Sequence, residues 1–166
     1  MDRFESDLMD DLKPVVVLTH PYEGGHTDHD STAFAVHLAC GVLRREGIVP
    51  PAILELTSYH LRDGEKVVQE FLPHERADRD QRVIRLGTRD RELKQRIFDA
   101  YGTQSALLES FNTSFERFRP APRYVFTRPP HPGLLNYERY GDPRRGMTWR
   151  EHARRALRAL RMRRDG

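Results

Sequence analysis

Three of the eight histidines of this chain lie in residues 20–29, within a stretch that also carries two aspartates. Residues 19–30 read Thr-His-Pro-Tyr-Glu-Gly-Gly-His-Thr-Asp-His-Asp. Neutral imidazoles bind zinc, and a carboxylate near a histidine fixes its tautomer or raises its pKa for acid–base work. Because His26 and His29 are three residues apart with Asp28 between them, this loop is a candidate metal site or acid–base site.

A structural interpretation of the same loop stands beside the chemical one. Asp28 or Asp30 can cap the helix that follows, which would leave the histidines as solvated loop residues. Spacing alone does not separate the two, because His-x-Asp-His is a short motif. Gly24-Gly25 permits backbone angles closed to other residues and would let a substrate approach closely.

The elements on either side place the loop where ligands commonly bind. Val15–Thr19 is apolar and mostly β-branched, which predicts a central parallel strand covered by helices on both faces. A helix is expected from about Asp30 to Arg45, with Phe34 and Leu38 on its apolar face. In open α/β sheets, ligands bind at the carboxyl ends of the strands. The loop between this strand and this helix is therefore a plausible site.

The rest of the chain alternates strand and helix patterns, which predicts an α/β fold with a β-hairpin insertion. The further expected strands are a hairpin of Ile53–Leu61 and Lys66–Leu72 around Asp63-Gly64, and the single strands Arg82–Leu86 and Arg123–Thr127. The further expected helices are one over Met1–Lys13 and one after Gly87-Thr88, whose apolar face carries Leu93, Ile97, Phe98 and Tyr101. A last helix is expected over 148–164, with a capping box of Thr148 and Glu151. A central parallel strand needs a neighbour on each side. Either later strands supply both neighbours of Val15–Thr19, or a part of the sheet precedes it.

Composition narrows the class of protein. The 166 residues suit a single domain, and 37% of them are hydrophobic. One cysteine excludes an internal disulfide, and no apolar run is long enough for a membrane span, so we expect a cytoplasmic protein without a membrane partner. Ten arginines lie in residues 139–166. We interpret this Arg-rich end as a solvated helix face and not as a nucleic-acid site, because arginine is frequent along the whole chain.

The strand followed by Thr-His-Pro-Tyr-Glu-Gly-Gly-His-x-Asp-His resembles the second signature of the PIG-L (LmbE-like) zinc-dependent N-deacetylases. The resemblance extends over residues 13–160 through Glu55–Tyr59, Gln69–Leu72, Glu116–Arg119, Phe126–His131, Tyr137-Glu138 and Trp149-Arg150. It implies a Rossmann-like α/β domain that hydrolyses the acetamide of an N-acetylated amino sugar, an N-acetylglucosaminyl-type substrate.

The same resemblance implies roles for individual residues. His29 would be a zinc ligand, and His26 would be a protonated histidine that stabilises the oxyanion or acts as the general acid. Asp28 would hold His26 and tune it. A zinc-bound water would attack the amide carbonyl. His131, in the sequence Pro-Pro-His-Pro-Gly, would contact substrate at the mouth of the site, the alternative being a surface loop histidine.

One family signature is not found in these 166 residues. His-Pro-Asp-Asp, which supplies two further zinc ligands and the general base, has no match, because His20-Pro21 and His131-Pro132 continue with other residues. A catalytic zinc normally keeps three protein ligands. We therefore expect residues 1–166 to form a single, partial, N-terminally truncated domain, weakly active or inactive on its own. The alternative is a non-catalytic remnant or a subunit completed by another chain. An open sheet edge at Val15–Thr19 would also permit self-association.

Overall fold

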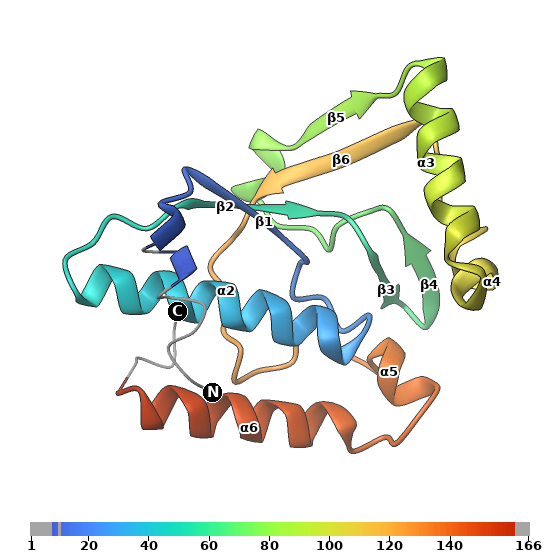
Figure 1. Ribbon diagram of the computed structural model, residues 1–166. Coiled ribbons are helices and arrows are strands. Elements are labelled where there is room, and N and C mark those ends of the chain that lie inside the picture. The colour runs from blue at the N-terminus through green and yellow to red at the C-terminus, as the bar shows by residue number, and fades with distance from the viewer. Residues whose placement is uncertain (1–7, 10, 162–166) are drawn as a thin grey trace.

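The computed structural model describes residues 8, 9 and 11–161, which form a mixed α/β structure (Figure 1). The strands are β1 (Val16–Thr19), β2 (Ala52–Leu56), β3 (Tyr59–Arg62), β4 (Glu65–Val68), β5 (Arg82–Arg85) and β6 (Phe115–Pro120). The α-helices are α2 (Thr27–Arg45), α3 (Thr88–Ala100), α4 (Ser105–Leu108), α5 (Asn136–Arg139) and α6 (Arg145–Ala159), and there are short 3₁₀ helices at Ala77–Asp80 and Gly102–Gln104. The predicted α/β class is confirmed.

The main sheet has four strands in the order β1-β2-β6-β5. β1 runs parallel to β2, with Thr19 opposite Glu55, whereas β6 pairs antiparallel with both β2 and β5. The prediction that Val15–Thr19 is a central, fully covered strand is therefore wrong: among the described residues it pairs with β2 alone. The reason is topological, because the later strand β6 takes the other edge of β2.

The two faces of β1 have different surroundings. Val17 packs beside Ile53 against a cluster that contains Cys40 and Leu43 of α2. Val16 and Leu18 point to the opposite face, and they are 45% and 59% exposed. An unpaired strand edge with apolar side chains is a ready template for pairing with another chain. Self-association through this edge stays a prediction.

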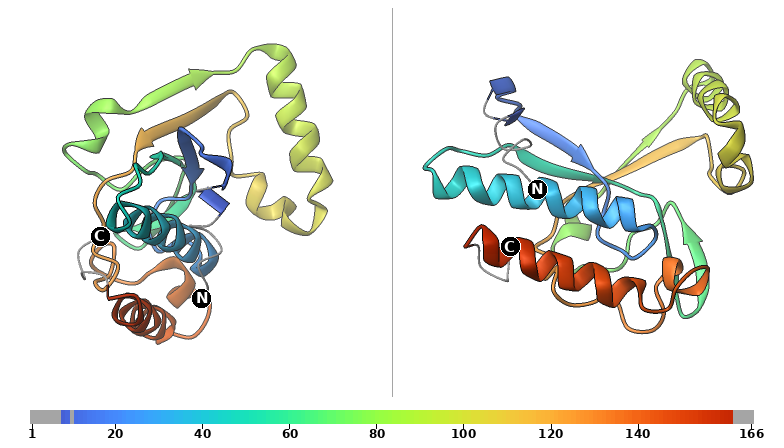
Figure 2. Two further views of the ribbon diagram at one scale, coloured as in Figure 1. Left: turned by 60° about the vertical axis from the view of Figure 1, so that its left-hand side comes forward. Right: turned by 60° about the horizontal axis from the view of Figure 1, so that its bottom comes forward.

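Two helices form successive layers on the covered face of the sheet. Figure 1 and both views of Figure 2 show α2 between the sheet and α6. Ala33, Phe34 and Leu38 of α2 share one apolar cluster with Ala153 and Leu157 of α6. The predicted apolar face of α2 is confirmed. This packing fixes the position of α2, whose first turn carries the candidate site.

The last helix begins at Arg145, three residues before the predicted start. Asp142 explains the difference, because its carboxylate accepts a hydrogen bond from the backbone N–H of Arg144 and its carbonyl accepts one from that of Arg145. These bonds begin the helical turn ahead of Thr148. The predicted capping box at Thr148 and Glu151 is wrong, since both residues lie inside the helix.

The hairpin prediction is confirmed, with a change in its first strand. β3 and β4 pair antiparallel around Asp63-Gly64, and both turn residues have positive φ, +54° and +82°. The expected strand Ile53–Leu61 is divided at Thr57-Ser58 into β2 and β3, which belong to different sheets. This break moves Ser58 to the carboxyl edge of β2, beside the candidate site.

The strand expected at Arg123–Thr127 is wrong, because the segment is irregular. Its alternating aromatic residues pack mainly against helices, although the hydroxyl of Tyr124 donates a hydrogen bond to Glu55 of β2 at 2.5 Å. Phe126 is 3% exposed and belongs to the cluster between α2 and α6, and Tyr124 packs against that cluster. The antiparallel partner of β2 is instead Phe115–Pro120, which had not been predicted as a strand.

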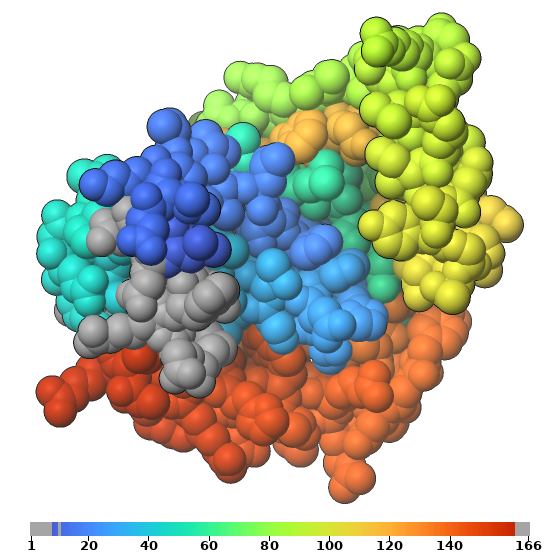
Figure 3. Space-filling view, viewed as in Figure 1, coloured from blue at the N-terminus to red at the C-terminus, as the bar shows by residue number. Residues whose placement is uncertain are grey.

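α3 lies beyond the far ends of β5 and β6, as Figure 1 shows. The helix itself is as predicted, but none of its residues is buried, and Leu93, Ile97 and Tyr101 of the predicted apolar face are 48%, 48% and 59% exposed. In the space-filling view the surface is hollowed between β1 and α2 on one side and α3 and α4 on the other (Figure 3).

The N-terminal helix prediction is tested only in part. Residues 8, 9, 11 and 12 are helical, and the rest of Met1–Lys13, apart from Lys13 itself, lies outside the described residues. The Arg-rich end is described as far as residue 161. Within the described part of the chain, no helix combines the length and the apolar character needed to span a membrane.

Candidate histidine site

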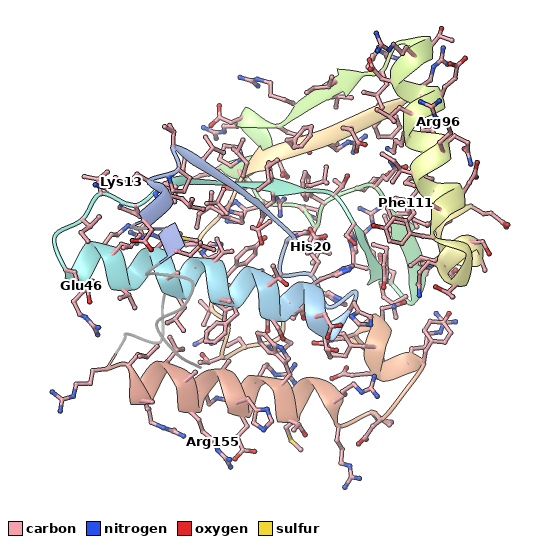
Figure 4. All side chains as sticks on the ribbon, viewed as in Figure 1. Lys13, His20, Glu46, Arg96, Phe111 and Arg155 are labelled. Atoms are coloured by element: carbon pink, nitrogen blue, oxygen red, sulfur yellow. The ribbon has the colours of Figure 1, made fainter. Side chains whose placement is uncertain are left out.

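The histidines gather at the carboxyl edge of the two parallel strands. His20 follows β1 directly, and His26 and His29 lie at the start of α2. Thr57 and Ser58 follow β2 at the same edge. Figure 4 shows His20 where β1 ends, above the first turns of α2. The sheet thus brings together the three histidines that the sequence grouped.

His26 is the N-cap of α2. Its backbone is extended (φ −140°, ψ 143°), and its Nδ1 accepts a hydrogen bond from the backbone N–H of Asp28 at 3.1 Å. The structural interpretation, in which Asp28 or Asp30 caps the helix, is therefore wrong. Because Nδ1 is the acceptor, the neutral ring of His26 carries its hydrogen on Nε2. The side chain of His26 is 47% exposed, so this donor is accessible.

Asp28 holds His26 mainly through its backbone. Its carboxylate Oδ2 lies 3.6 Å from His26 Nδ1, and its side chain is 85% exposed. When His26 is protonated, Nδ1–H can no longer accept the backbone N–H, and the Asp28 carboxylate is the nearby acceptor. The backbone N–H of Asp28 can thus hold the neutral ring of His26, and the Asp28 carboxylate can hold the protonated ring.

His29 is the most enclosed of the candidate residues at this edge. Its Nδ1 lies 3.1 Å from Ser58 Oγ, and its ring stacks on His20 with the ring centres 4.0 Å apart and the planes at 9°. The edge of Tyr59 contacts it on another side. Burial, followed by the neighbouring His20 and His26, lowers the pKa of His29 to about 4, so the ring is neutral at pH 7.

His20 is a second neutral imidazole at this edge. Burial is the main cause that lowers its pKa, and His26 adds to the effect. The stacking of His20 on His29 indicates a structural role for His20, since it holds the His29 ring in one orientation.

The two glycines fit the loop tightly against its neighbours. A Cβ on Gly25 would lie 1.9 Å from the carbonyl oxygen of Tyr59, and Gly24 has a φ of +71° with Leu135 against it. Asn136 Nδ2 donates a hydrogen bond to Gly25 O at 2.9 Å. The space that we expected a substrate to use at Gly25 is thus occupied by the β3 backbone. The positive φ at Gly24 is as expected.

The carboxylate of Asp30 is buried under the loop and accepts hydrogen bonds from it. The backbone N–H groups of Glu23 and Gly24 donate to its Oδ1 at 3.3 and 3.1 Å, and the hydroxyl of Tyr137 donates to its Oδ2 at 3.0 Å. The side chain is fully buried. Burial raises the pKa of Asp30 to about 7, although the three hydrogen bonds oppose this shift.

The zinc expected from the resemblance can be compared with these side chains. In the described part of the chain, no group of three or more histidine, cysteine or acidic residues is arranged to hold a metal ion. The parallel rings of His20 and His29 do not point their nitrogens at one common ion. His29 alone has the features of a ligand: it is neutral, and its Nδ1 faces a hydroxyl, which leaves Nε2 for a metal. The residues present thus fit one position of a zinc site and not a whole site.

His131 lies apart from the hydrogen bonds of this cluster. Its Nδ1 donates to the carbonyl oxygen of Pro132 at 2.8 Å, and its Nε2 is buried without a partner among the described residues. No contact described for this chain joins His131 to His26 or His29. Its role in substrate binding stays a prediction.

Two side chains at this edge were missed by the sequence interpretation. Ser58 contacts His29, but it lies inside what reads as one continuous strand, so nothing in the local pattern indicates it. Glu23, in the same loop, is buried, and its Oε1 accepts a hydrogen bond from the backbone N–H of Leu72 at 2.6 Å and lies 3.5 Å from the guanidinium of Arg119.

Comparison with protein-family models, with curated proteins and with solved structures finds no match to this chain. The chemistry of the site therefore rests on its own geometry.

Proposed function

We propose that this chain is part of a PIG-L-like, Rossmann-like zinc-dependent N-deacetylase that acts on an N-acetylglucosaminyl-type substrate. In this proposal His29 is a zinc ligand, His26 is the acid or oxyanion donor, and Asp28 is its partner. The proposal includes a cytoplasmic location. It also holds that the chain alone is weakly active or inactive.

The observation that carries the proposal is the setting of His29. It is a neutral imidazole at the carboxyl edge of two parallel strands, and its Nδ1 is 3.1 Å from the Ser58 hydroxyl. Ligating histidines characteristically hydrogen-bond through the nitrogen that does not bind the metal. With the hydrogen on Nδ1 donated to Ser58, the lone pair of Nε2 is free and oriented.

His26 supports the hydrolytic part of the proposal. Its accessible Nε2–H can donate to the oxygen of an amide carbonyl as negative charge develops there. On protonation, the Asp28 carboxylate at 3.6 Å stabilises the imidazolium. A bound zinc would supply a water of lowered pKa and would polarise the carbonyl.

A second candidate, a subunit completed by another chain, is favoured by the edge of β1. That edge is unpaired among the described residues, and its side chains Val16 and Leu18 are exposed. A strand added there would end at the same carboxyl edge as β1 if it ran parallel. Ligands carried at the end of such a strand would lie near His29.

Zinc binding and acetate release by the full chain, alone and with a complementing polypeptide, test the proposal. The complement carries a strand followed by His-Pro-Asp-Asp. We expect the chain alone to bind zinc weakly and to release no acetate from an N-acetylglucosaminyl substrate. With the complement, zinc binding tightens and acetate is released.

Matched variants separate the roles. His29→Ala should abolish both tight zinc binding and acetate release in the complemented mixture, whereas His26→Ala should abolish acetate release and leave zinc binding intact. His152→Ala, at an exposed histidine of α6, is the control and should change neither. Tight, stoichiometric zinc or acetate release with the chain alone would contradict the incomplete site. A complemented mixture that binds no zinc would contradict the role of His29.

A further inference from the structure

A pocket in another part of the molecule is lined by cationic side chains. Its lining includes Pro73 and His74, from the chain after β4, and Arg123 and Arg128, from the chain after β6. Its volume is about 250 Å³. A second pocket of about 730 Å³ shares its lining residues Pro73, His74, Pro122 and Arg123. Small-molecule sites commonly occupy ~300–1,000 Å³, so the two pockets together have the size of a metabolite site.

The smaller pocket has two arginines available for a ligand. Arg123 and Arg128 line it and are exposed, and within the described residues their guanidinium groups have no hydrogen-bond or ion-pair partner. Arg119 also lines this pocket, but its donors are directed to Glu55 and Asp78. The acidic side chains Glu75 and Asp80 line only the larger pocket. Glu23 lines the smaller one, but it is 2% exposed and its carboxylate lies against His60 and Arg119, so the smaller pocket is the end suited to an anion.

His74 adds a neutral donor between the two pockets. Its Nδ1 accepts a hydrogen bond from the backbone N–H of Ala77 at 3.3 Å. The neutral ring therefore carries its hydrogen on Nε2, which has no partner among the described residues. The smaller pocket thus combines two guanidinium groups with an imidazole N–H.

The framework around these donors is fixed by hydrogen bonds and by prolines. Asp78 accepts from the backbone N–H of His74 at 2.7 Å and from the guanidinium of Arg119 at 3.0 Å. The hydroxyl of Tyr22 donates to the carbonyl oxygen of Arg128 at 2.8 Å. Five prolines line the two pockets, Pro73, Pro120, Pro122, Pro129 and Pro130. A backbone that is already ordered reduces the entropy lost when a ligand binds.

We propose that this pocket binds a small molecule that carries a phosphate monoester, with the phosphate held by Arg123, Arg128 and His74 and the remainder in the larger pocket. Arginine pairs with phosphate through two parallel hydrogen bonds. A phosphate monoester offers three terminal oxygens to these three donor groups, whereas a carboxylate offers only two. None of the three residues belongs to the histidine site, so this proposal is independent of the proposed deacetylase function.

Titration of the full chain with inorganic phosphate, glucose 1-phosphate and acetate, in a chloride buffer of constant ionic strength, tests this site. Binding is followed by calorimetry and by the arginine side-chain N–H signals in NMR spectra. Both phosphate compounds should bind saturably, with glucose 1-phosphate the tighter because the larger pocket holds its sugar, and acetate should bind more weakly. The double variant Arg123→Gln, Arg128→Gln should lose about tenfold or more in affinity, since it removes charge-assisted hydrogen bonds.

The control has the same loss of charge at another place. Arg89→Gln with Arg91→Gln, on exposed positions of α3, should leave the affinity unchanged. Thermal unfolding shows whether both double variants keep the stability of the wild type, as exposed arginines should. The proposal is overturned if neither phosphate compound saturates the protein, if the two double variants weaken binding equally, or if acetate binds as tightly as phosphate.

Discussion

Replacement of Arg119 by methionine should destabilise this protein more than the loss of any surface ion pair. Arg119 is 2% exposed, and its guanidinium lies 3.1 Å from Glu55, 3.0 Å from Asp78 and 3.5 Å from Glu23. Removal of one member of a buried ion pair costs about 3–5 kcal/mol, because the remaining charges stay buried without compensation. Such a cost is a large part of the ~5–15 kcal/mol that stabilises a typical domain.

The assay is urea unfolding followed by circular dichroism, with Arg62→Met as the matched control. Arg62 pairs with Glu70 at 2.9 Å, but the two side chains are 39% and 49% exposed, so its loss should cost less than about 1 kcal/mol. If Arg119→Met does not fold, Asp78→Asn removes one partner that is 38% exposed and should cost about 1 kcal/mol. Equal costs for Arg119→Met and Arg62→Met would refute the reasoning.

Three further predictions concern the loop, the sheet edge and pH. Gly25→Ala should lower the free energy of unfolding, measured by urea titration, by about 1–3 kcal/mol, because its Cβ would lie 1.9 Å from the carbonyl oxygen of Tyr59. An unchanged midpoint of the urea unfolding transition would contradict this prediction. Val16→Lys should reduce any self-association measured by analytical ultracentrifugation, because it places a charge on the unpaired edge of β1. Val49→Lys, at a 91% exposed position, is the control and should not reduce it. A wild type that is monomeric at every concentration would contradict pairing through β1. Because burial raises the folded pKa of Asp30 to about 7, the folded state keeps a proton that the unfolded state loses above pH ~4. The free energy of unfolding should therefore fall as pH rises from about 4 to 7, by up to about 1.4 kcal/mol per pH unit, and Asp30→Asn should remove this slope.

The local elements could be predicted from sequence because their signals are local. The apolar periodicity of α2 and the Asp63-Gly64 turn each depend on a few neighbouring residues, and both are found in the structure. The pairing of strands depends on residues far apart in the chain. Phe115–Pro120 has its two phenylalanines three residues apart among charged residues, which is not a strand alternation, and only its pairing with β2 and β5 makes it a strand. The aromatic residues of Arg123–Thr127 do alternate as in a strand, but Phe126 packs between α2 and α6, and Tyr124 packs beside that cluster with its hydroxyl on Glu55 of β2.

The candidate site likewise has a part that the sequence shows and a part that depends on distant residues. The grouping of His26, Asp28 and His29 is visible in the sequence, since all three lie within one helical turn. The partner of His29 is not, because Ser58 reaches it only through the break between β2 and β3. Likewise, the tight fit at Gly25 comes from the carbonyl oxygen of Tyr59, on a hairpin more than thirty residues away.

The central claim is that Nε2 of His29 is available to a metal while Nδ1 is held by Ser58. Long-range ¹H–¹⁵N NMR spectra of the histidine side chains, recorded during a zinc titration of the full chain, test it most directly. We predict that zinc shifts the His29 Nε2 signal, while Nδ1 keeps its hydrogen toward Ser58, and that Ser58→Ala weakens the effect. Zinc that perturbs other histidines and leaves His29 unchanged, or that binds His29 through Nδ1, would contradict the account.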